Sequence, residues 1–291
     1  MGRGHPECPE RLSAIHDQFI AAGLDGVIDH HEAPLAEDEH LLRVHDAGYI
    51  AELRAASPQH GTVHLDPDTA MCPYTLEAAL RAAGAGVLAV DRVMAGSNAG
   101  AFCAVRPPGH HALRDRAMGF CFFNNVAVAA RHALAAHGLE RVAVVDFDVH
   151  HGNGTEQAFA GDPRVMMAGT FQHPFYPYSG TDAPAANMHN VPLAAGTDGR
   201  GFREAFEQVC LPELERFAPE MIFISAGFDA HREDDMAMLR LVEADYVWVT
   251  RHLRGIAERH AQGRVVSLLE GGYALSALGR SVVAHVRELA A

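Results

Sequence analysis

The sequence predicts a single α/β domain in which a mostly parallel sheet is covered by helices on both faces. Short apolar runs rich in β-branched residues, such as residues 142–145, recur along the chain, as expected of strands that are buried on both faces. These runs alternate with longer segments of helical periodicity, which is the order that builds a parallel sheet. The length also fits, because 291 residues with 48% hydrophobic side chains can bury one large core.

The N-terminal half is expected to be mainly helical. A loop punctuated by prolines at residues 4–11 precedes the first helix, and Asp66-Pro67-Asp68 forms a turn. A long Ala-rich helix then ends at the Gly-Ser-Asn-Ala-Gly segment of residues 96–100. Helices are expected at residues 12–22, 38–45, 48–56, 75–94 and 126–136. Strands are expected at residues 27–30 and 101–105, and the second runs into a Pro-Pro-Gly turn that excludes a helix.

Strands and helices alternate regularly in the C-terminal half. Buried strands are expected at residues 142–145, 165–169, 221–225 and 265–268, because each run is short and apolar on both faces. Helices are expected to follow them at residues 155–159, 199–217, 242–260 and 275–289. In open sheets of this class, the active site lies beyond the carboxyl ends of the strands.

The composition excludes several classes of protein. The net charge of −14 argues against an extended nucleic-acid groove and would attract a cationic substrate. No apolar run is long enough to cross a membrane and the N-terminus lacks the apolar core of a signal peptide, so we expect a cytoplasmic protein. The chain contains no Lys, which favours a GC-rich bacterial source. The cysteines show no CxxC pair, which predicts reduced thiols rather than disulfides or a thiolate zinc site.

Carboxylates and imidazoles follow the strand of residues 142–145. If the backbone stays extended past Val145, then Asp146, Asp148 and His150 emerge on one side, with successive Cα atoms roughly 6.5 Å apart. Carboxylate oxygen and imidazole nitrogen atoms from such neighbours can converge on one divalent ion at about 2.0–2.2 Å from each. The alternative interpretation is a solvated loop with turn chemistry, and the other strand ends bear on that choice.

Other expected strand ends also carry polar groups. Residues 106–111 end in two adjacent imidazoles, residues 226–235 contain several carboxylates, and residues 270–273 end in a tyrosine. Residues 172–180 form a further loop rich in Pro and aromatic side chains. Polar groups at so many C-terminal strand ends are difficult to explain by chance, so we predict one composite site at this edge of the sheet.

Six motifs occur together in the order and with the spacing of a known family. They are His5-Pro6-Glu7, Arg106-Pro107-Pro108-Gly109-His110-His111, Gly119-Phe120-Cys121-Phe122-Phe123-Asn124-Asn125, Asp146-Phe147-Asp148-Val149-His150-His151-Gly152-Asn153-Gly154, Gly227-Phe228-Asp229 and Glu270-Gly271-Gly272-Tyr273. Together they resemble the histone deacetylase superfamily, and most closely its class II and bacterial branch of histone-deacetylase-like and acetylpolyamine amidohydrolases. The likeness runs from about residue 4 to the C-terminus. It implies a three-layer arginase/deacetylase-like fold for residues 1–291.

The resemblance also implies a zinc-dependent deacetylase that removes acetyl or other acyl groups from N-acyl-lysine side chains or related amines and releases acetate. One zinc ion per chain would be held by Asp148, His150 and Asp229. The implied catalytic residues are His110 and His111, with Asp146 and Asn153 behind them, and Tyr273. The implied substrate-binding residues are Gly119, Phe120 and Tyr176 in an acyl-lysine channel and Arg11 near an internal acetate-release cavity. Three protein ligands would leave zinc an open position, as in catalytic zinc sites.

The sequence departs from the family pattern at three places. The chain starts almost at the His-Pro-Glu loop, whereas the family usually has a strand before it, so we expect either a misassigned start codon or a sheet position that is empty or filled differently. Asn153 replaces the Asp that is common in class I, as it does in class II. Gly169 stands where many members have a Ser that helps to bind a structural potassium ion. A potassium ion near Asp146 and Asp148 is therefore a weaker expectation than zinc.

Alternative functions can be compared at the level of residues. An arginase-type manganese ureohydrolase shares the fold class, but no second bridging set of Asp and His follows His231 at the right distance. An acyl-lysine binder without activity would lack a ligand or a catalytic group, and all are present. An acetylpolyamine specialist needs a carboxylate for the distal ammonium, whereas the loop after Asp229 runs into Met236, Ala237 and Met238. We therefore favour acyl-lysine over acetylpolyamine as substrate. A homo-oligomer is compatible with the sequence.

Overall fold

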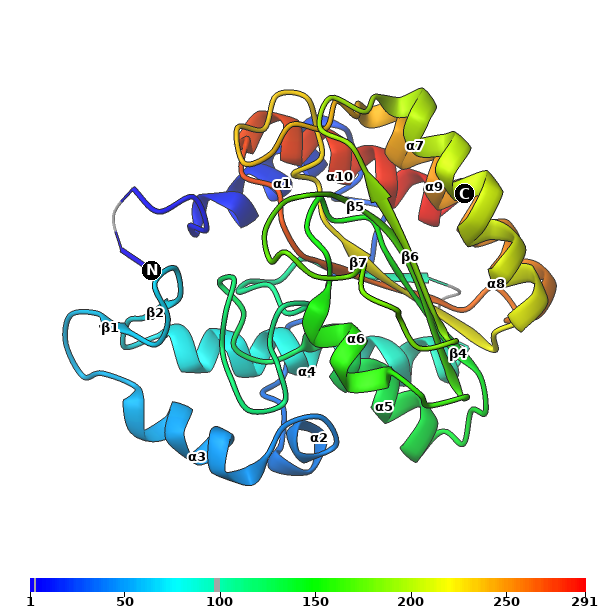
Figure 1. The fold of residues 1–291 in the computed structure, drawn as a ribbon. Helices are drawn as coiled ribbons and strands as arrows, with labels where there is room; N and C mark the ends of the chain where they lie inside the picture. Colours follow the sequence, from blue (N-terminus) through cyan, green and yellow to red (C-terminus); the bar gives the residue numbers. More distant parts are fainter. Residues whose placement is uncertain (3, 97–99) are drawn as a thin grey trace.

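The computed structural model describes residues 1–2, 4–96 and 100–291 and shows a parallel six-stranded sheet between two layers of helices (Figure 1). The order across the sheet is β3-β8-β7-β4-β5-β6, and every neighbouring pair is parallel. The strands are β3 (Gly100–Cys103), β4 (Val142–Asp146), β5 (Val165–Gln172), β6 (Met188–Leu193), β7 (Met221–Ala226) and β8 (Val265–Leu269). The predicted fold class is therefore confirmed, with all six carboxyl ends at one edge.

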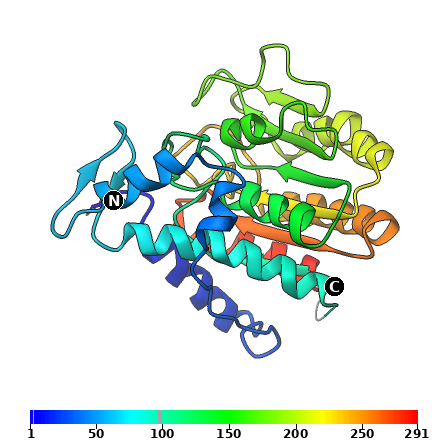
Figure 2. The ribbon, with the colours of Figure 1, turned by 90° about the horizontal axis from the view of Figure 1, so that it is seen from below.

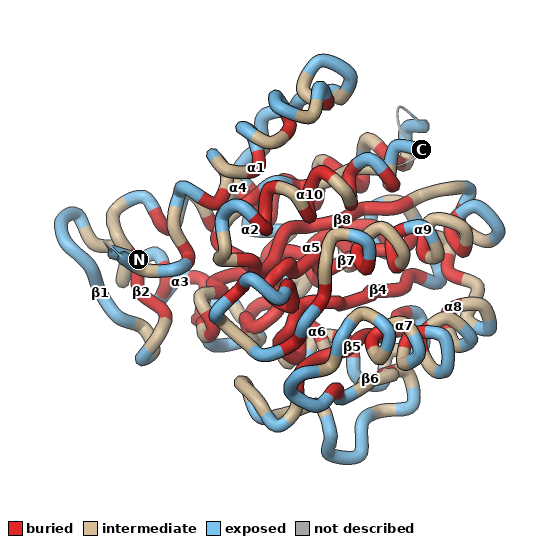
Figure 3. The backbone as a smooth tube through the Cα atoms, turned by 90° about the horizontal axis from the view of Figure 1, so that it is seen from above, coloured by how far each residue is buried: buried red, intermediate tan, exposed pale blue. Residues whose placement is uncertain are grey.

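The central strand β4 shows how the sheet separates two cores. All five of its residues are buried, and successive side chains of a strand point to opposite faces. Ala143 and Val145 pack into one apolar cluster, whereas Val142 and Val144 pack into the other. Burial on both faces explains why this segment is apolar without alternation. Figure 3 shows the strands as a buried layer between more exposed helices.

Each face of the sheet has its own set of helices. The face of Ala143 is covered by α1 (Glu10–Ala21), α7 (Gly199–Ala205), the π-helical turn η1 (Phe206–Cys210), α8 (Leu211–Phe217), α9 (Glu243–His260) and α10 (Leu275–Leu289). The opposite face is covered by α4 (Thr75–Met94), α5 (Asn125–Ala136) and α6 (Asn153–Phe159), as the view from below shows (Figure 2). In the parts of the chain that the structure describes, no helix is long and apolar enough to cross a membrane.

A smaller third cluster lies on the outer side of α4. It contains buried side chains from α2 (Asp38–Leu42) and α3 (Ala47–Ala56), which pack against Ala79, Ala83 and Val87 of α4. A short antiparallel hairpin, β1 (Val63–His64) and β2 (Ala70–Met71), flanks the turn expected at residues 66–68. The turn between β1 and β2 includes Asp68, which lines the cavity at the carboxyl ends of the strands.

Several expected elements differ from the observed ones. The strand predicted at residues 27–30 is wrong, because the backbone N–H groups of Val27 and Ile28 both donate to the Leu24 carbonyl and form a turn. The helix expected at residues 199–217 contains η1 in its middle. Strand β6 was not expected; it contains Pro192, which an edge strand tolerates. The segment expected to end α4 falls partly on residues 97–99, which lie outside the described residues.

Candidate active site

Three buried ligand atoms converge beyond the carboxyl end of β4. His150 Nδ1 lies 3.0 Å from Asp148 Oδ1 and 3.3 Å from Asp229 Oδ2, and the three ligand atoms all lie within 4.8 Å of one another. Asp148 and His150 follow β4, and Asp229 follows the neighbouring strand β7. The strand ends at Asp146 and residues 148–150 bend, so the expected convergence occurs without the extended backbone that we assumed.

The hydrogen bonds of these carboxylates indicate that a cation fits between them. Asp229 Oδ1 accepts a hydrogen bond from the Val149 backbone, whereas its buried Oδ2 has no hydrogen-bond partner among the described residues and faces His150 Nδ1 at 3.3 Å. Such an orphaned carboxylate oxygen is costly unless something positive faces it. Asp148 is held by the backbone N–H groups of His150 and Gly271. Two carboxylates and one imidazole, all buried, form a donor set that suits a divalent metal ion with an open coordination position.

Two imidazoles lie in contact beside this cluster. The ring centroids of His110 and His111 are 4.1 Å apart, and the ring of His111 lies 5.7 Å from that of His150. His110 Nδ1 is 2.9 Å from Asp146 Oδ2, and His111 Nδ1 is 2.7 Å from Asn153 Oδ1. Because both partners accept, each Nδ1 carries a proton, and a neutral His111 then has a free lone pair on Nε2.

The surroundings give the two imidazoles opposite tendencies. Burial alone would lower the pKa of His110, but the nearby carboxylates of Asp148, Asp146 and Glu270 raise it well above its ordinary value. Burial lowers the pKa of His111, and the positive charges of its imidazole neighbours lower it further. One ring is therefore suited to hold a positive charge and the other to accept a proton.

Tyr273 is fixed from two sides beyond the end of β8. Its backbone N–H donates to Asp234 Oδ2 over 2.6 Å, and the N–H of Ala274 donates to the same oxygen over 2.9 Å. The guanidinium of Arg11 lies 4.9 Å from the ring centroid of Tyr273. Arg11 is fully buried in α1 and donates from Nε to the Gly272 carbonyl over 2.7 Å. Arg11 thus lies behind Tyr273 and does not line the cavity described below.

Glu270 is a buried carboxylate for which the sequence analysis predicted no role. It accepts hydrogen bonds from the backbone N–H of Gly109 over 2.6 Å, from that of His110 over 3.1 Å, and from Ser225 Oγ over 3.1 Å. Burial raises its pKa to about 7. Glu270 lies directly after β8, and the hydrogen bonds that it accepts from Gly109 and His110 orient the loop of the paired imidazoles. The signal in the sequence was an acidic residue directly after an apolar strand.

A cavity of about 140 Å³ leads to these groups. The three residues predicted as channel walls, Gly119, Phe120 and Tyr176, all line it, together with His110, His111, His150 and Tyr273. Its lining also includes residues that the sequence analysis did not predict as channel walls: Asp68, Pro108, Phe175, Met236 and Gly271. The ring of Phe175 stacks on His150 with centroids 5.5 Å apart. The Pro- and aromatic-rich composition of residues 172–180 was the signal for this wall.

The part of the cavity wall formed by Gly119 and Phe120 depends on an unusual backbone. Gly119 and Phe120 are both left-handed, with φ of 56° and 67°. A Cβ on Gly119 would overlap the His111 ring, so a glycine is required there for steric as well as conformational reasons. Asp68 Oδ1 accepts from the Gly119 N–H over 3.2 Å and Thr69 Oγ1 accepts from the Phe120 N–H over 3.0 Å. These bonds hold the wall in place.

The remaining sequence expectations can be located in the fold. Gly169 on β5 packs directly against the backbone of Asp146, where a Cβ would overlap the Asp146 carbonyl oxygen. Residue 169 therefore offers no side-chain oxygen for a potassium ion near Asp146 and Asp148, and that ion stays a prediction. His231 faces Glu243, with Nε2 and Oε2 3.5 Å apart, so it belongs to a different contact from the buried ligand cluster.

Comparison with known proteins agrees with this geometry. The family model described as histone deacetylase domain matches residues 5–289. A histone deacetylase-like amidohydrolase of Pseudomonas aeruginosa is 40% identical over 293 residues, covering 98% of this chain and 77% of that protein. The mouse polyamine deacetylase HDAC10 is 37% identical over 306 residues, covering 97% of this chain and 44% of that protein.

A solved structure extends the agreement to three dimensions. The crystal structure of the HDA15 HD domain matches with a TM-score of 0.93 and 34% sequence identity, over 99% of this chain and 84% of that chain. The chain belongs to the histone deacetylase family and has the α/β fold of its catalytic domain, as an amidohydrolase of that family.

Proposed function

We propose that this protein is a zinc-dependent deacetylase that hydrolyses the side-chain amide of N-acyl-lysine and releases acetate or a related acid. The observation that carries the proposal is the orphaned Asp229 Oδ2, buried beside Asp148 and His150 at the cavity lined by His110, His111 and Tyr273. Zinc bound by these three ligands would polarise the acyl carbonyl and lower the pKa of water to about 7. The donor set supports zinc because it combines nitrogen and oxygen ligands and leaves a position open.

The protein's own groups account for the proton movements. Nε2 of a neutral His111 takes a proton from the attacking water, whose oxygen bonds to the acyl carbon. The same proton then passes to the leaving nitrogen as the C–N bond breaks, which yields the free amine and the carboxylic acid. General acid–base catalysis of this kind contributes about 10²–10⁴ in rate. The lowered pKa of His111 keeps the ring in the base form.

His110 and Tyr273 stabilise developing negative charge and do not transfer protons. His110, oriented by Asp146, stays protonated and stabilises negative charge that develops on the reacting groups. The Tyr273 hydroxyl donates a hydrogen bond to the developing oxyanion, and burial raises its pKa, which keeps the hydroxyl proton in place. The walls formed by Gly119, Phe120 and Tyr176 exclude water from the acyl group.

The lining of the cavity supports acyl-lysine as the substrate over an acetylated polyamine. Among the described residues that line it, Asp68 is the one acidic side chain, and its Oδ1 already accepts from Gly119 and Thr69. The loop that follows Asp229 in the chain contributes the apolar side chain of Met236 to the lining. At Met236 a distal ammonium would meet an apolar side chain instead of a carboxylate, whereas Asp68 and the polyamine deacetylase among the relatives keep an acetylated polyamine as the second candidate.

The test is acetate release from a panel of acyl-lysine peptides and acetylated polyamines, with the metal content measured on the same protein. We expect about one zinc per chain for this site, because three ligands with one open position make one catalytic centre. Activity should be lost on chelation and restored by zinc. Asp148→Ala should lose both the metal of this site and the activity. His111→Ala should keep the metal but lower kcat by about 10²–10⁴, whereas the exposed His60→Ala serves as control. A metal-free protein, or no metal-dependent release from any substrate, would refute the proposal.

A further inference from the structure

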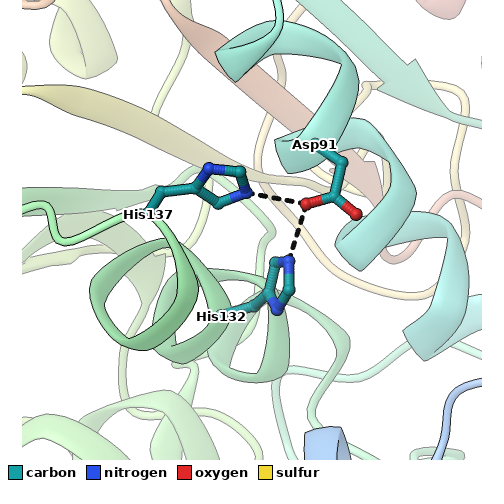
Figure 4. A group of neighbouring side chains, drawn as sticks. All are labelled: Asp91, His132 and His137. Carbon is teal, nitrogen blue, oxygen red and sulfur yellow. Dashed lines mark hydrogen bonds and ion pairs between the residues drawn. The ribbon is translucent and has the colours of Figure 1, made fainter.

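A second cluster of metal-ligand side chains lies away from the cavity, between α4 and α5. Asp91 belongs to α4, His132 to α5, and His137 is the residue that caps the end of α5. Their ligand atoms all lie within 4.8 Å of one another. Figure 4 shows both imidazole rings pointing at one oxygen of Asp91, with the other oxygen turned away.

We propose that Asp91, His132 and His137 bind a second divalent transition-metal ion, which links the C-terminal ends of α4 and α5. Two imidazoles and a carboxylate suit Zn²⁺, Co²⁺, Ni²⁺ or Cu²⁺. The cluster faces solvent through Asp91, whose side chain is 49% exposed, so water completes the coordination. The proposal is independent of the function of the buried site, because it uses none of its residues.

The positions of the ligand atoms require only a small adjustment. His132 Nε2 and His137 Nε2 lie 2.8 Å and 2.7 Å from the same Asp91 Oδ1. Tetrahedral zinc at about 2.0–2.1 Å from its ligands needs them about 3.3 Å apart, so each contact must widen by about half an ångström. The half-exposed Asp91 and the partly exposed His137 can make that movement without disturbing the core.

The chemistry of the three side chains also suits a cation. Metal binds a carboxylate in its ionised form and an imidazole in its neutral form, and this cluster offers one carboxylate and two imidazoles.

Arg43 opposes metal binding at His132, and this opposition gives the proposal a specific test. Arg43 donates from one of its terminal nitrogens to His132 Nδ1 over 2.9 Å, so Nδ1 carries no proton and Nε2 does. Metal on Nε2 requires the proton to move to Nδ1, which then needs an acceptor. Arg43 must turn away, and it has a second partner in Glu39, whose Oε1 lies 2.6 Å from its other terminal nitrogen.

The experiment measures Zn²⁺ bound by the zinc-loaded enzyme after equilibrium dialysis over a series of buffered Zn²⁺ concentrations. The wild type should take up a second equivalent and gain thermal stability with it. His137→Gln and Asp91→Asn should each lose that equivalent while keeping the first one and full acyl-lysine activity. Asp148→Ala should lose the buried equivalent but keep the one at Asp91, so failure of one site is distinguishable from failure of the other.

Arg43→Gln provides the matched gain of affinity. The Gln carbonyl can accept from His132 Nδ1–H, and such outer partners change metal affinity by about 10–100-fold, so we expect binding at least about tenfold tighter. An unchanged affinity would overturn the assignment of His132 as a ligand. Saturation at one equivalent in the wild type, or a second equivalent that survives both His137→Gln and Asp91→Asn, would overturn the site as a whole.

Discussion

A single added carbon at Gly271 should disturb the buried ligand cluster without changing any ligand. A Cβ at this position would overlap Asp229 Oδ2 and lie 2.7 Å from Asp148 Oδ2, whereas ordinary contacts begin at 3.4 Å. The Asp148 oxygen would have to move by about 0.7 Å and the Asp229 oxygen by more, while metal–ligand distances tolerate only about 0.2 Å. We therefore expect Gly271→Ala to lose most of its zinc and to lower kcat/KM by about 10²-fold or more. Overpacking this buried position should also cost about 1–3 kcal/mol of stability.

The matched control is Gly48→Ala, on the exposed side of α3. A Cβ there meets nothing within 4 Å, and alanine in a helix is favoured over glycine by about 1 kcal/mol, so this variant should be fully active and no less stable. The assay is zinc content by elemental analysis on gel-filtered protein, with turnover and urea unfolding on the same samples. If Gly271→Ala kept both full zinc content and wild-type turnover, the ligand assignment of Asp148 and Asp229 would be wrong.

Three further predictions follow from contacts around the site. Tyr273→Phe should keep zinc and fold but lower kcat by about 10²–10³, the effect of one oxyanion donor; equal turnover would mean that the hydroxyl points elsewhere. Asp234→Ala frees the backbone of Tyr273 and should lower kcat by about tenfold or more with KM unchanged, and Asp234→Asn, which keeps an acceptor, should recover most of the loss. Burial lowers the pKa of His45 to about 4, whereas the pKa is about 6.5 in the unfolded chain. As the pH falls from 6.5 towards 4, the unfolded chain therefore takes up a proton that the folded protein does not. The free energy of unfolding should fall by about 3 kcal/mol over this range and be unaffected by His45 above pH 6.5. Urea unfolding at both ends of this range should show a smaller loss for His45→Gln than for the wild type, and identical losses would contradict the assignment.

The segments that the sequence predicts best are those in which local signals and packing agree. The predicted bounds of α4 and α10 match the observed ones because each helix has a continuous apolar face and clear breaks at both ends. Strand β6 was missed because its polar residues and Pro192 are acceptable only at a sheet edge. Residues 27–30 were assigned to a strand from two apolar side chains alone, and no neighbouring strand pairs with them in the described structure.

The residues of the candidate site likewise fall into those with a signal in the local sequence and those without one. The proximity of Asp148, His150 and Asp229 could be predicted because each follows a buried strand and the parallel sheet brings those ends together, whereas their choice as ligands came from the family resemblance. Asp234 and Phe175 could not, because their roles depend on how long loops fold back over the sheet edge. Asp234, for example, accepts hydrogen bonds from backbone N–H groups of another loop, and no pattern in the residues next to it in the sequence indicates this.

The unequal use of the two oxygens of Asp229 bears on how the site could be loaded. Oδ1 accepts a hydrogen bond from the Val149 N–H of the loop after β4, whereas Oδ2 has no hydrogen-bond partner in the described part of the chain. This hydrogen bond fixes the side-chain torsions during folding, so little rotational freedom remains to be lost when a cation arrives. An ion could therefore bind to ligands that are already in position. It could also exchange for another ion of similar size, or dissociate, without unfolding of the surrounding loops.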